Sequence, residues 1–482
     1  MEVTVQSFTR LFPATPIKTP HTESLSIVEA FSTHSTAEAL WFYDAVLDQS
    51  SSSIAERLKT SLVKTLDIFP QYSGRVSANT ATQEGDHTER NGRLKLVWGT
   101  EKDLGLGLVI AKAEGRLSDL VPDPEQRRGM KGGWDHSNIP IKSLLPGDAF
   151  RPALITFLAQ ITTFECGGFA LAISTSHALM DGGCLALFLQ NWAYEHNLIF
   201  SSQPPKKGPP MPVFKPQLLD REAAGDIDGE GIDPSIAQQC QNLPQPHREP
   251  SLSNGTDHDE PALSKIFHFS GSEVDAIHAG AQIENQPVGR QQALIAYIWR
   301  TVNRARGWSA DGREMNLGMT FDLRRRLGLP TTFLGSAVIH ADAHLPGRDI
   351  CNGSLNELSI KVKDTLNRYD ATSLRALLHV LAYEKDPAKF AGQPGGLPPD
   401  RNLIVSIIPR MGFYDAIFEG QVPKFVTPTT ILIKGLVMVM DARPSEPGKE
   451  LKAWTDDGID VVMTLEAETM EKLASDSAVW TI

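Results

Sequence analysis

Cysteine is scarce in this chain of 482 residues. Its four cysteines, Cys166, Cys184, Cys240 and Cys351, form no CxxC pair and are far too sparse for a disulfide scaffold. Free cysteine is usually buried as a small apolar side chain. We therefore expect four reduced thiols and neither a disulfide framework nor a cysteine nucleophile.

Long apolar runs and basic stripes are missing as well. No segment reaches the ~20 apolar residues that a membrane span needs, and the first residues lack the apolar core of a signal peptide. The sequence thus predicts a cytoplasmic protein without a membrane partner. The formal net charge is −12 and no Lys- or Arg-rich stripe is present, which argues against a nucleic-acid partner because such proteins replace phosphate counterions with a basic face.

What is present suits a large globular protein. Hydrophobic residues make up 41% of the chain, and its length favours two domains over one core. Between residues 201 and 262 the composition changes to Pro, Gly and acidic residues, which is typical of a linker. We predict an N-terminal half at 1–200, a linker or crossover at 201–262 and a C-terminal half at 263–482.

Both halves show α+β patterns. Helical spacing of apolar residues predicts helices over 58–69 and 290–304, and a segment rich in Ala, Leu, Trp and Phe within 25–47 also suits a helix. Strand-like runs in the first half lie at 94–98, 108–113, 154–164 and 169–174. Strand-like runs in the second half lie at 265–269, 315–321, 337–341, 403–408, 437–441 and 461–465.

The most informative segment is 166–183, in which an apolar strand ends at His177 and a helix follows. Asp181 is placed to cap that helix through its free N–H groups, and Gly182 removes a side chain beside the histidine. Taken alone, the spacing His-x-x-x-Asp is weak, because such pairs recur by chance and a histidine at a strand end is more often structural.

The context of this segment resembles the BAHD acyltransferase family, whose common motif is His-x-x-x-Asp-Gly. Further blocks are similar to family landmarks in the right order: Leu25-Ser26, Ser61-Leu62 through Pro70 and Gly74-Arg75, Ala293-Leu294 with Ala296 and Trp299, Phe321-Asp322-Leu323-Arg324 ahead of Pro330 and Gly335, and Met463-Thr464-Leu465 through Met470 and Asp476. Several ordered blocks are more specific than one motif.

One landmark departs from the family. The family carries Asp-Phe-Gly-Trp-Gly late in the chain, whereas residues 417–421 read Ile-Phe-Glu-Gly-Gln, followed by Pro423. A relaxed version of this motif is expected in the fungal, natural-product branch of the family, which includes trichothecene acetyltransferase-like enzymes of secondary metabolism. Glu29, where the family tends to have Asp, is a milder change.

The resemblance implies two similar chloramphenicol-acetyltransferase-like domains with mixed sheets and an active-site channel at their interface. It also implies that coenzyme A enters this channel from one end and the acceptor from the other. We expect acetyl-CoA or another acyl-CoA as cosubstrate, a hydrophobic small molecule as acceptor and no permanently bound cofactor. A monomer is expected because the two halves already bury each other. A neutral imidazole can deprotonate a hydroxyl or amine, so His177 is the predicted general base. No convincing Ser or Cys nucleophile is present, and Ser176 should point to the opposite face of the strand from His177, so we expect direct transfer without an acyl-enzyme.

The supporting residues follow from the same resemblance. Asp181 is similar to the family aspartate that faces away from substrate and pairs with an arginine, for which we choose Arg324, with Gly182 as structural support. In the alternative reading, Asp181 polarises His177 directly as in a catalytic triad. Ser406 and the Phe418–Gly420 region are weaker candidates for cofactor binding or oxyanion stabilisation, and Lys424 or Lys434 for contact with CoA phosphates.

Other functions stay open at this point. The altered 417–421 stretch allows a BAHD-like fold repurposed as a cyclase that transfers nothing. A condensation domain usually carries a second histidine where Ser176 stands, and a non-catalytic small-molecule binding protein would not need His177. The run Asp257-His258-Asp259 lies in the linker and is better explained as solvated chain than as a metal site. No metal is predicted.

Overall fold

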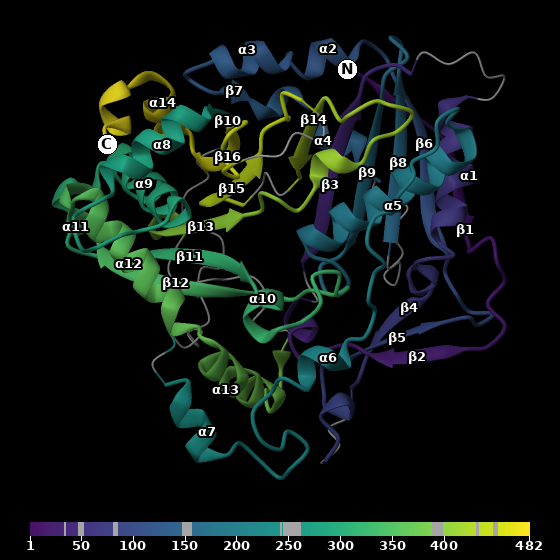
Figure 1. Cartoon of the computed structure of the whole chain (residues 1–482), viewed down its shortest axis with the longest axis horizontal. Coiled ribbons are helices and arrows are strands. Elements are labelled where there is room, and N and C mark those ends of the chain that lie inside the picture. The colour runs from purple at the N-terminus through teal and green to yellow at the C-terminus, as the bar shows by residue number, and fades with distance from the viewer. Residues whose placement is uncertain are drawn as a thin grey trace.

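Two lobes, each built on a mixed β-sheet, lie side by side along the long axis of the molecule (Figure 1). The computed structural model describes residues 1–32, 35–46, 53–80, 85–146, 157–241, 243, 262–387, 399–429, 433–446 and 452–482. Within these ranges no helix has both the length and the apolar character needed to cross a bilayer. The α+β class with two mixed-sheet lobes, predicted from the sequence, is confirmed.

The N-terminal lobe is organised around a six-stranded sheet. β6 and β8 run parallel and every other neighbouring pair is antiparallel. In sheet order the strands are β1 (Val3–Leu11), β6 (Leu106–Ala113), β8 (Phe157–Phe164), β9 (Phe169–Ser176), β3 (Thr36–Tyr43) and β14 (Phe425–Pro428). A smaller sheet contains β2 (His21–Ser24), β5 (Leu94–Trp98) and β4 (Arg75–Ala78).

Helices α1 (Ile54–Thr65) and α5 (Gly182–Phe200) pack against the larger of these sheets. Leu58 and Leu62 of α1 are fully buried in the same cluster as Leu171 and Ile173 of β9. Because α5 is apolar around most of its circumference, it is buried between α1 and the sheet. This packing fixes the end of β9, where the predicted catalytic segment begins.

The C-terminal lobe contains a seven-stranded sheet in which β11–β13 and β13–β15 are parallel pairs. In sheet order the strands are β12 (Val338–Pro346), β11 (Glu314–Asp322), β13 (Asn402–Ile407), β15 (Leu436–Asp441), β16 (Ile459–Glu466), β10 (Ala262–Phe269) and β7 (Trp134–Asp135). Each lobe therefore takes one strand from the other half of the chain: β14 comes from the C-terminal half and β7 from the N-terminal half.

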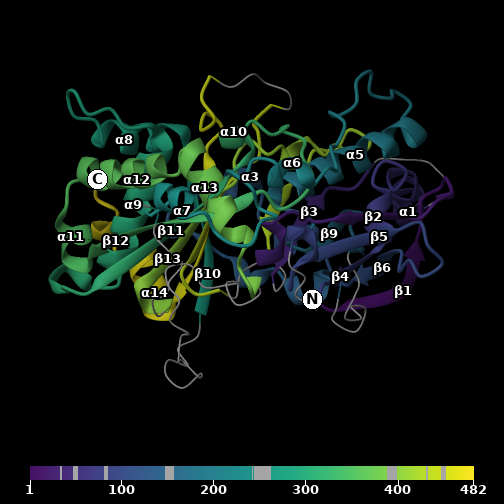
Figure 2. The ribbon, with the colours of Figure 1, turned by 90° about the horizontal axis from the view of Figure 1, so that it is seen from below.

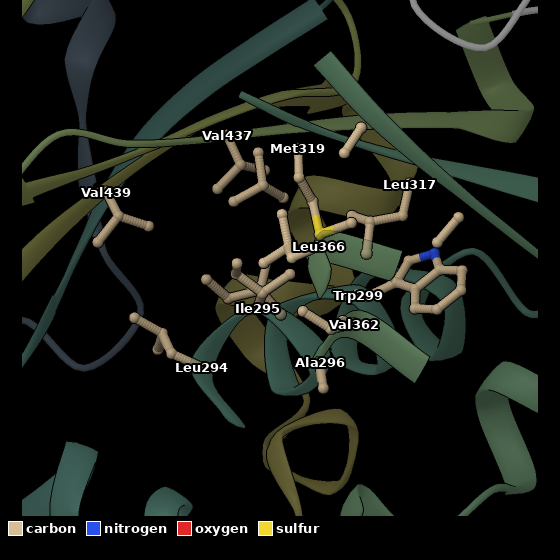
Figure 3. Close-up of a cluster of buried hydrophobic side chains, with 14 of the residues drawn as sticks. Leu294, Ile295, Ala296, Trp299, Leu317, Met319, Val362, Leu366, Val437 and Val439 are labelled. Carbon is tan, nitrogen blue, oxygen red and sulfur yellow. The ribbon is translucent and has the colours of Figure 1, made fainter. Parts of the chain in front are cut away.

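Helices α9 (Arg290–Ala305) and α12 (Leu355–Arg368) cover one face of this sheet (Figure 3). Alternate residues of β11, such as Leu317 and Met319, point into that core, whereas Thr320 is only half-buried. In Figure 2, helices α8 (Gly271–Gly280), α9 and α12 form a layer above these strands. The second face of the sheet carries polar residues such as Thr320 and also apolar ones, since Ile266 and Val462 are buried in a cluster with Phe42 of β3.

The remaining helices lie within or between the two lobes. They include α2 (Leu117–Leu120), α3 (Pro124–Gly129), α4 (Ile141–Leu144), α6 (Gln217–Asp220), α7 (Pro234–Gln239), α10 (Arg324–Leu327), α11 (Gly347–Asn352), α13 (Ala371–Ala382) and α14 (Ala467–Ser475), with the 3-10 turns η1 (Glu29–Ser32) and η2 (Pro70–Ser73).

Two sequence expectations need correction. Residues 36–43 form strand β3 and not a helix, because the segment lies between β9 and β14 and pairs with both. The segment 201–262 is partly packed, since Leu219, Cys240 and Leu243 are buried in the C-terminal core. The predicted domain boundaries at 200 and 263 stay a prediction, and residues 244–261 lie outside the described chain.

Candidate active site

The segment around His177 connects a buried strand to a buried helix. β8 and β9 form a hairpin whose turn contains Gly167 in the left-handed region, at φ +83°, a conformation that glycine adopts without strain. β9 ends at Ser176, and the main-chain N–H of His177 donates to the Ser35 carbonyl at 2.8 Å. His177 is therefore fixed by its backbone at the edge between β9 and β3.

The imidazole of His177 is held through one nitrogen. Its Nδ1 lies 3.1 Å from Oγ of the fully buried Ser336. In the tautomer whose Nδ1–H donates to that hydroxyl, Nε2 carries a lone pair. Burial lowers the pKa of His177 below its ordinary value of 6.5, although the Asp181 charge opposes this effect. The imidazole is consequently neutral at neutral pH and can accept a proton at Nε2.

Asp181 caps α5, as the sequence predicts. Its Oδ1 accepts the N–H of Cys184 at 3.0 Å. Its Oδ2 accepts Nη1 of Arg324 at 2.7 Å and the N–H of Ala337 at 3.2 Å. Burial alone would raise the pKa of Asp181, but Arg324 and these hydrogen bonds lower it below its usual range, so the carboxylate is ionised.

Arg324 binds the segment that carries Ser336. Besides Asp181, its guanidinium donates to the Phe333 carbonyl at 3.1 and 2.9 Å and to the Gly335 carbonyl at 3.0 Å. It also contacts the Cys184 thiol, whose pKa is raised to about 12 chiefly by burial. This pairing, which the sequence predicted, connects the start of α5 to the residues that hold His177.

The triad alternative is not supported by this geometry. Both oxygens of Asp181 are occupied by donors other than His177, and the histidine's Nδ1 faces Ser336. Asp181 therefore acts on His177 only through its charge and through the backbone that it anchors.

Gly182 allows another loop to approach the start of α5. A Cβ at this position would lie 3.3 Å from Met411 Sδ and 3.9 Å from Ile408 Cγ2. Ile408 directly follows β13, the strand that carries Ser406. The hydroxyl of Ser406 accepts a hydrogen bond from Thr320 Oγ1 at 2.8 Å, which leaves the Ser406 proton available for another acceptor.

The sequence did not reveal two residues near His177. Ser336 follows Gly335, a family landmark, but its contact with His177 spans 159 positions and has no local signal. His340 lies on β12 and pairs in register with Thr320. The His340 side chain is exposed, and its pKa is lowered chiefly by partial desolvation and also by His177, so the two imidazoles lie within electrostatic reach of each other.

The 417–421 stretch packs against the core of the N-terminal lobe. Phe418 is fully buried in the N-terminal core, where its ring contacts Tyr43 and Trp192 edge-on. Gly420 adopts φ +81° with open space on the side where a Cβ would lie, and neither residue contacts His177. The cofactor-binding roles of Phe418 and Gly420 therefore stay predictions, and Phe418 itself contributes an apolar ring to the core.

Glu419 in this stretch forms a buried ionic network. It accepts Nε of Arg57 at 3.0 Å and Nη2 at 3.3 Å, and its Oε1 lies 2.7 Å from Nε2 of His196. The ion-paired side chains are 6% and 9% exposed. Glu419 therefore connects the loop at 417–421 to Arg57 of α1 and to His196 of α5.

We expect Glu419→Gln to lower the free energy of unfolding by about 3 kcal/mol, because removing one partner of a buried pair leaves the other charge uncompensated. Urea denaturation followed by circular dichroism measures this. The matched control is Glu56→Gln, which changes an exposed glutamate next to Arg57 and should shift stability by less than about 0.5 kcal/mol. Equal effects of the two substitutions would contradict a supporting role for the Arg57–Glu419 pair.

The lysines suggested for CoA phosphates are not equivalent. Lys424 is buried, and its Nζ lies 2.7 Å from Asp123 and 3.7 Å from Asp44, so its charge is already paired. Contact of Lys434 with the phosphates of coenzyme A stays a prediction. The run at 257–259 lies outside the described residues.

Comparison with known proteins agrees with this geometry. The model of the Transferase family matches residues 1–479. The chain is 30% identical to the acyltransferase AFT15-1 of Alternaria alternata, over 99% of this chain and 97% of that protein. It is 26% identical to putrescine hydroxycinnamoyltransferase 1 of Oryza sativa subsp. japonica, over 86% of this chain and 84% of that protein.

Among solved structures, F. graminearum TRI101 complexed with coenzyme A and deoxynivalenol has a TM-score of 0.67 at 16% identity, covering 95% of this chain and 98% of that one. Vinorine synthase gives a TM-score of 0.66 at 18% identity, covering 98% and 96%. At these identities the likeness shows a common fold. With the family match over nearly the whole length, it follows that the chain belongs to the Transferase family and is an acyltransferase of the BAHD type.

Proposed function

We propose that this enzyme transfers an acyl group, acetyl in the simplest case, from coenzyme A to a hydroxyl or amine of a small hydrophobic natural product, with His177 as general base. The observation that carries the proposal is the state of His177. Its Nδ1 is held by Ser336, and burial lowers its pKa, so a neutral Nε2 is ready to accept the acceptor's proton.

The steps follow from these groups. Nε2 of His177 removes the proton as the acceptor oxygen or nitrogen attacks the thioester carbonyl. The tetrahedral oxyanion then collapses, the C–S bond breaks, and the thiolate leaves and takes the proton from the imidazolium. Both substrates are present together, so no covalent enzyme intermediate forms.

The oxyanion needs a donor, and Ser406 is our choice. Its oxygen already accepts from Thr320 at 2.8 Å, so its own proton is directed elsewhere, and Ile408 on the same strand end lies near Gly182. A preorganised hydroxyl of this kind stabilises developing negative charge without reorganising.

The relatives support the substrate classes. TRI101 structures contain coenzyme A together with deoxynivalenol or T-2 mycotoxin, which are small-molecule acceptors. The name of putrescine hydroxycinnamoyltransferase 1 includes an amine, and for this reason the proposal keeps an amine acceptor beside a hydroxyl.

Calorimetric titration of the full chain with coenzyme A and with acetyl-CoA tests the proposal before any acceptor is known. We expect saturable binding with one site per chain, in the wild type and in His177→Ala alike, because the base is not needed to hold the donor. Absence of heat up to millimolar ligand, repeated in the presence of a panel of natural-product alcohols and amines to allow for acceptor-first binding, would overturn the donor assignment.

A further inference from the structure

Glu29 is a fully buried carboxyl group with an incomplete set of partners. The residue begins η1 and has 0% exposure. Its Oε2 accepts the N–H of Ser26, whereas Oε1 makes no hydrogen bond within the described residues. A buried polar atom without a partner is costly, so the surroundings of Glu29 require an explanation.

Those surroundings include the segment that holds His177. Oε1 of Glu29 occupies the space where a Cβ at Gly335 would be, and Gly335 adopts φ +139°. Ser336 comes next and contacts Nδ1 of His177. A few residues after η1, the Ser35 carbonyl accepts the His177 N–H. Glu29 therefore lies where the two segments that fix His177 meet.

Among the described residues, no cation compensates a charge on Glu29. The titratable and charged groups around it are Asp220 of α6, Tyr72 of η2, Arg93 before β5 and Arg324 of α10. Arg324 is committed to Asp181, to Asp322 and to main-chain carbonyls. Arg93 donates to the carbonyls of Ile27, Leu381 and Ala382. Asp220, which accepts the Ile27 N–H, adds negative charge. A carboxylate at position 29 would thus be both desolvated and repelled.

We propose that Glu29 is a positioning residue for His177: as a neutral acid it holds Gly335–Ser336 against the imidazole, and its ionisation releases that segment. An ionised Glu29 attracts main-chain N–H groups. Oε2 already accepts that of Ser26, and the Ser336 N–H is a second one, which acts on the carboxyl weakly. Turning that N–H toward the charge moves the Ser336 hydroxyl away from Nδ1. Burial, the largest cause, raises the pKa of Glu29 to about 8, which places the release just above neutral pH.

The experiment, which rests on the proposed function, compares the pH dependence of kcat for acyl transfer in the wild type, Glu29→Gln and Glu29→Asp. We expect wild-type kcat to fall as pH rises through about 8. The isosteric amide cannot ionise, so Glu29→Gln should keep a level kcat over that range. Glu29→Asp retains an ionisable acid and should retain an alkaline fall.

Thermal melting separates this idea from the failure of the proposed function, because it needs no substrate. The unfolded chain releases the Glu29 proton near 4.5 and the folded chain only near 8, so folded-state stability due to this group is lost as pH rises between these values. The midpoint should therefore fall more between pH 5 and 8 in the wild type than in Glu29→Gln. The proposal would be overturned if the melting midpoint and kcat depended on pH in the same way in the wild type and in Glu29→Gln. If Glu29→Gln lowered kcat by the same factor at every pH, Glu29 would contribute packing alone.

Discussion

We expect His177→Ala to lower kcat by about 10³-fold, within the range that a positioned general base contributes, without changing the affinity for coenzyme A. The reason is that alanine removes the Nε2 that accepts the proton, while the fold around it loses only one hydrogen bond to Ser336. Steady-state kinetics with acetyl-CoA and an acceptor from the panel, and calorimetry with coenzyme A, measure the two quantities.

The matched control for this prediction is Ser176→Ala. Ser176 is the last residue of β9 and directly precedes His177. Within the described part of the chain its hydroxyl accepts only the N–H of Ala178, so we expect nearly full activity. A large loss in Ser176→Ala with little loss in His177→Ala would replace the general-base mechanism with a serine nucleophile, which would also form an acyl-enzyme detectable by mass spectrometry.

The acid side of the rate profile tests the same assignment. Burial lowers the pKa of His177 below 6.5, and only the neutral imidazole accepts a proton. The acid decline of wild-type kcat/KM should therefore have its midpoint below pH 6.5. A decline centred above 6.5 would contradict the buried, neutral state of this histidine.

Local patterns predicted the catalytic segment well. The apolar run before His177 predicted strand β9, and the helical spacing after Asp181 predicted α5 and the turn before it. Both elements are determined by residues that are near one another in the sequence. The pairing of Arg324 with Asp181 came from the family resemblance, and the structure contains it. The role of each residue in catalysis stays a proposal.

Nonlocal contacts explain what the sequence did not predict. Residues 36–43 look helical by composition, but two neighbouring strands impose an extended conformation on them. Ser336 and Glu29 matter only because residues far apart in the sequence meet at His177. By contrast, the start of α12 has a local sequence signal, since Ser354 and Glu357 form a capping box.

The buried pair of Asp181 and Arg324 carries the second large prediction. Their side chains are 4% and 7% exposed. Removing one partner by Arg324→Met or Asp181→Asn should lower the free energy of unfolding by about 3–5 kcal/mol, because the remaining group is left charged or only partly paired in the interior. Urea denaturation measures the loss, and the double variant should recover part of it.

Asp181→Asn also separates support from direct catalysis. The Asp181 charge raises the pKa of His177 against the effect of burial, so its removal should shift the acid limb of kcat/KM to lower pH. The amide still accepts one N–H at the start of α5, and we therefore expect activity at neutral pH to fall less than in His177→Ala. In a catalytic triad, by contrast, the aspartate-to-asparagine change fixes the wrong tautomer of the histidine and costs about 10⁴-fold in kcat. A loss of that size in Asp181→Asn, with stability unchanged, would support the catalytic triad and would mean that Ser336 does not determine which nitrogen of His177 is free.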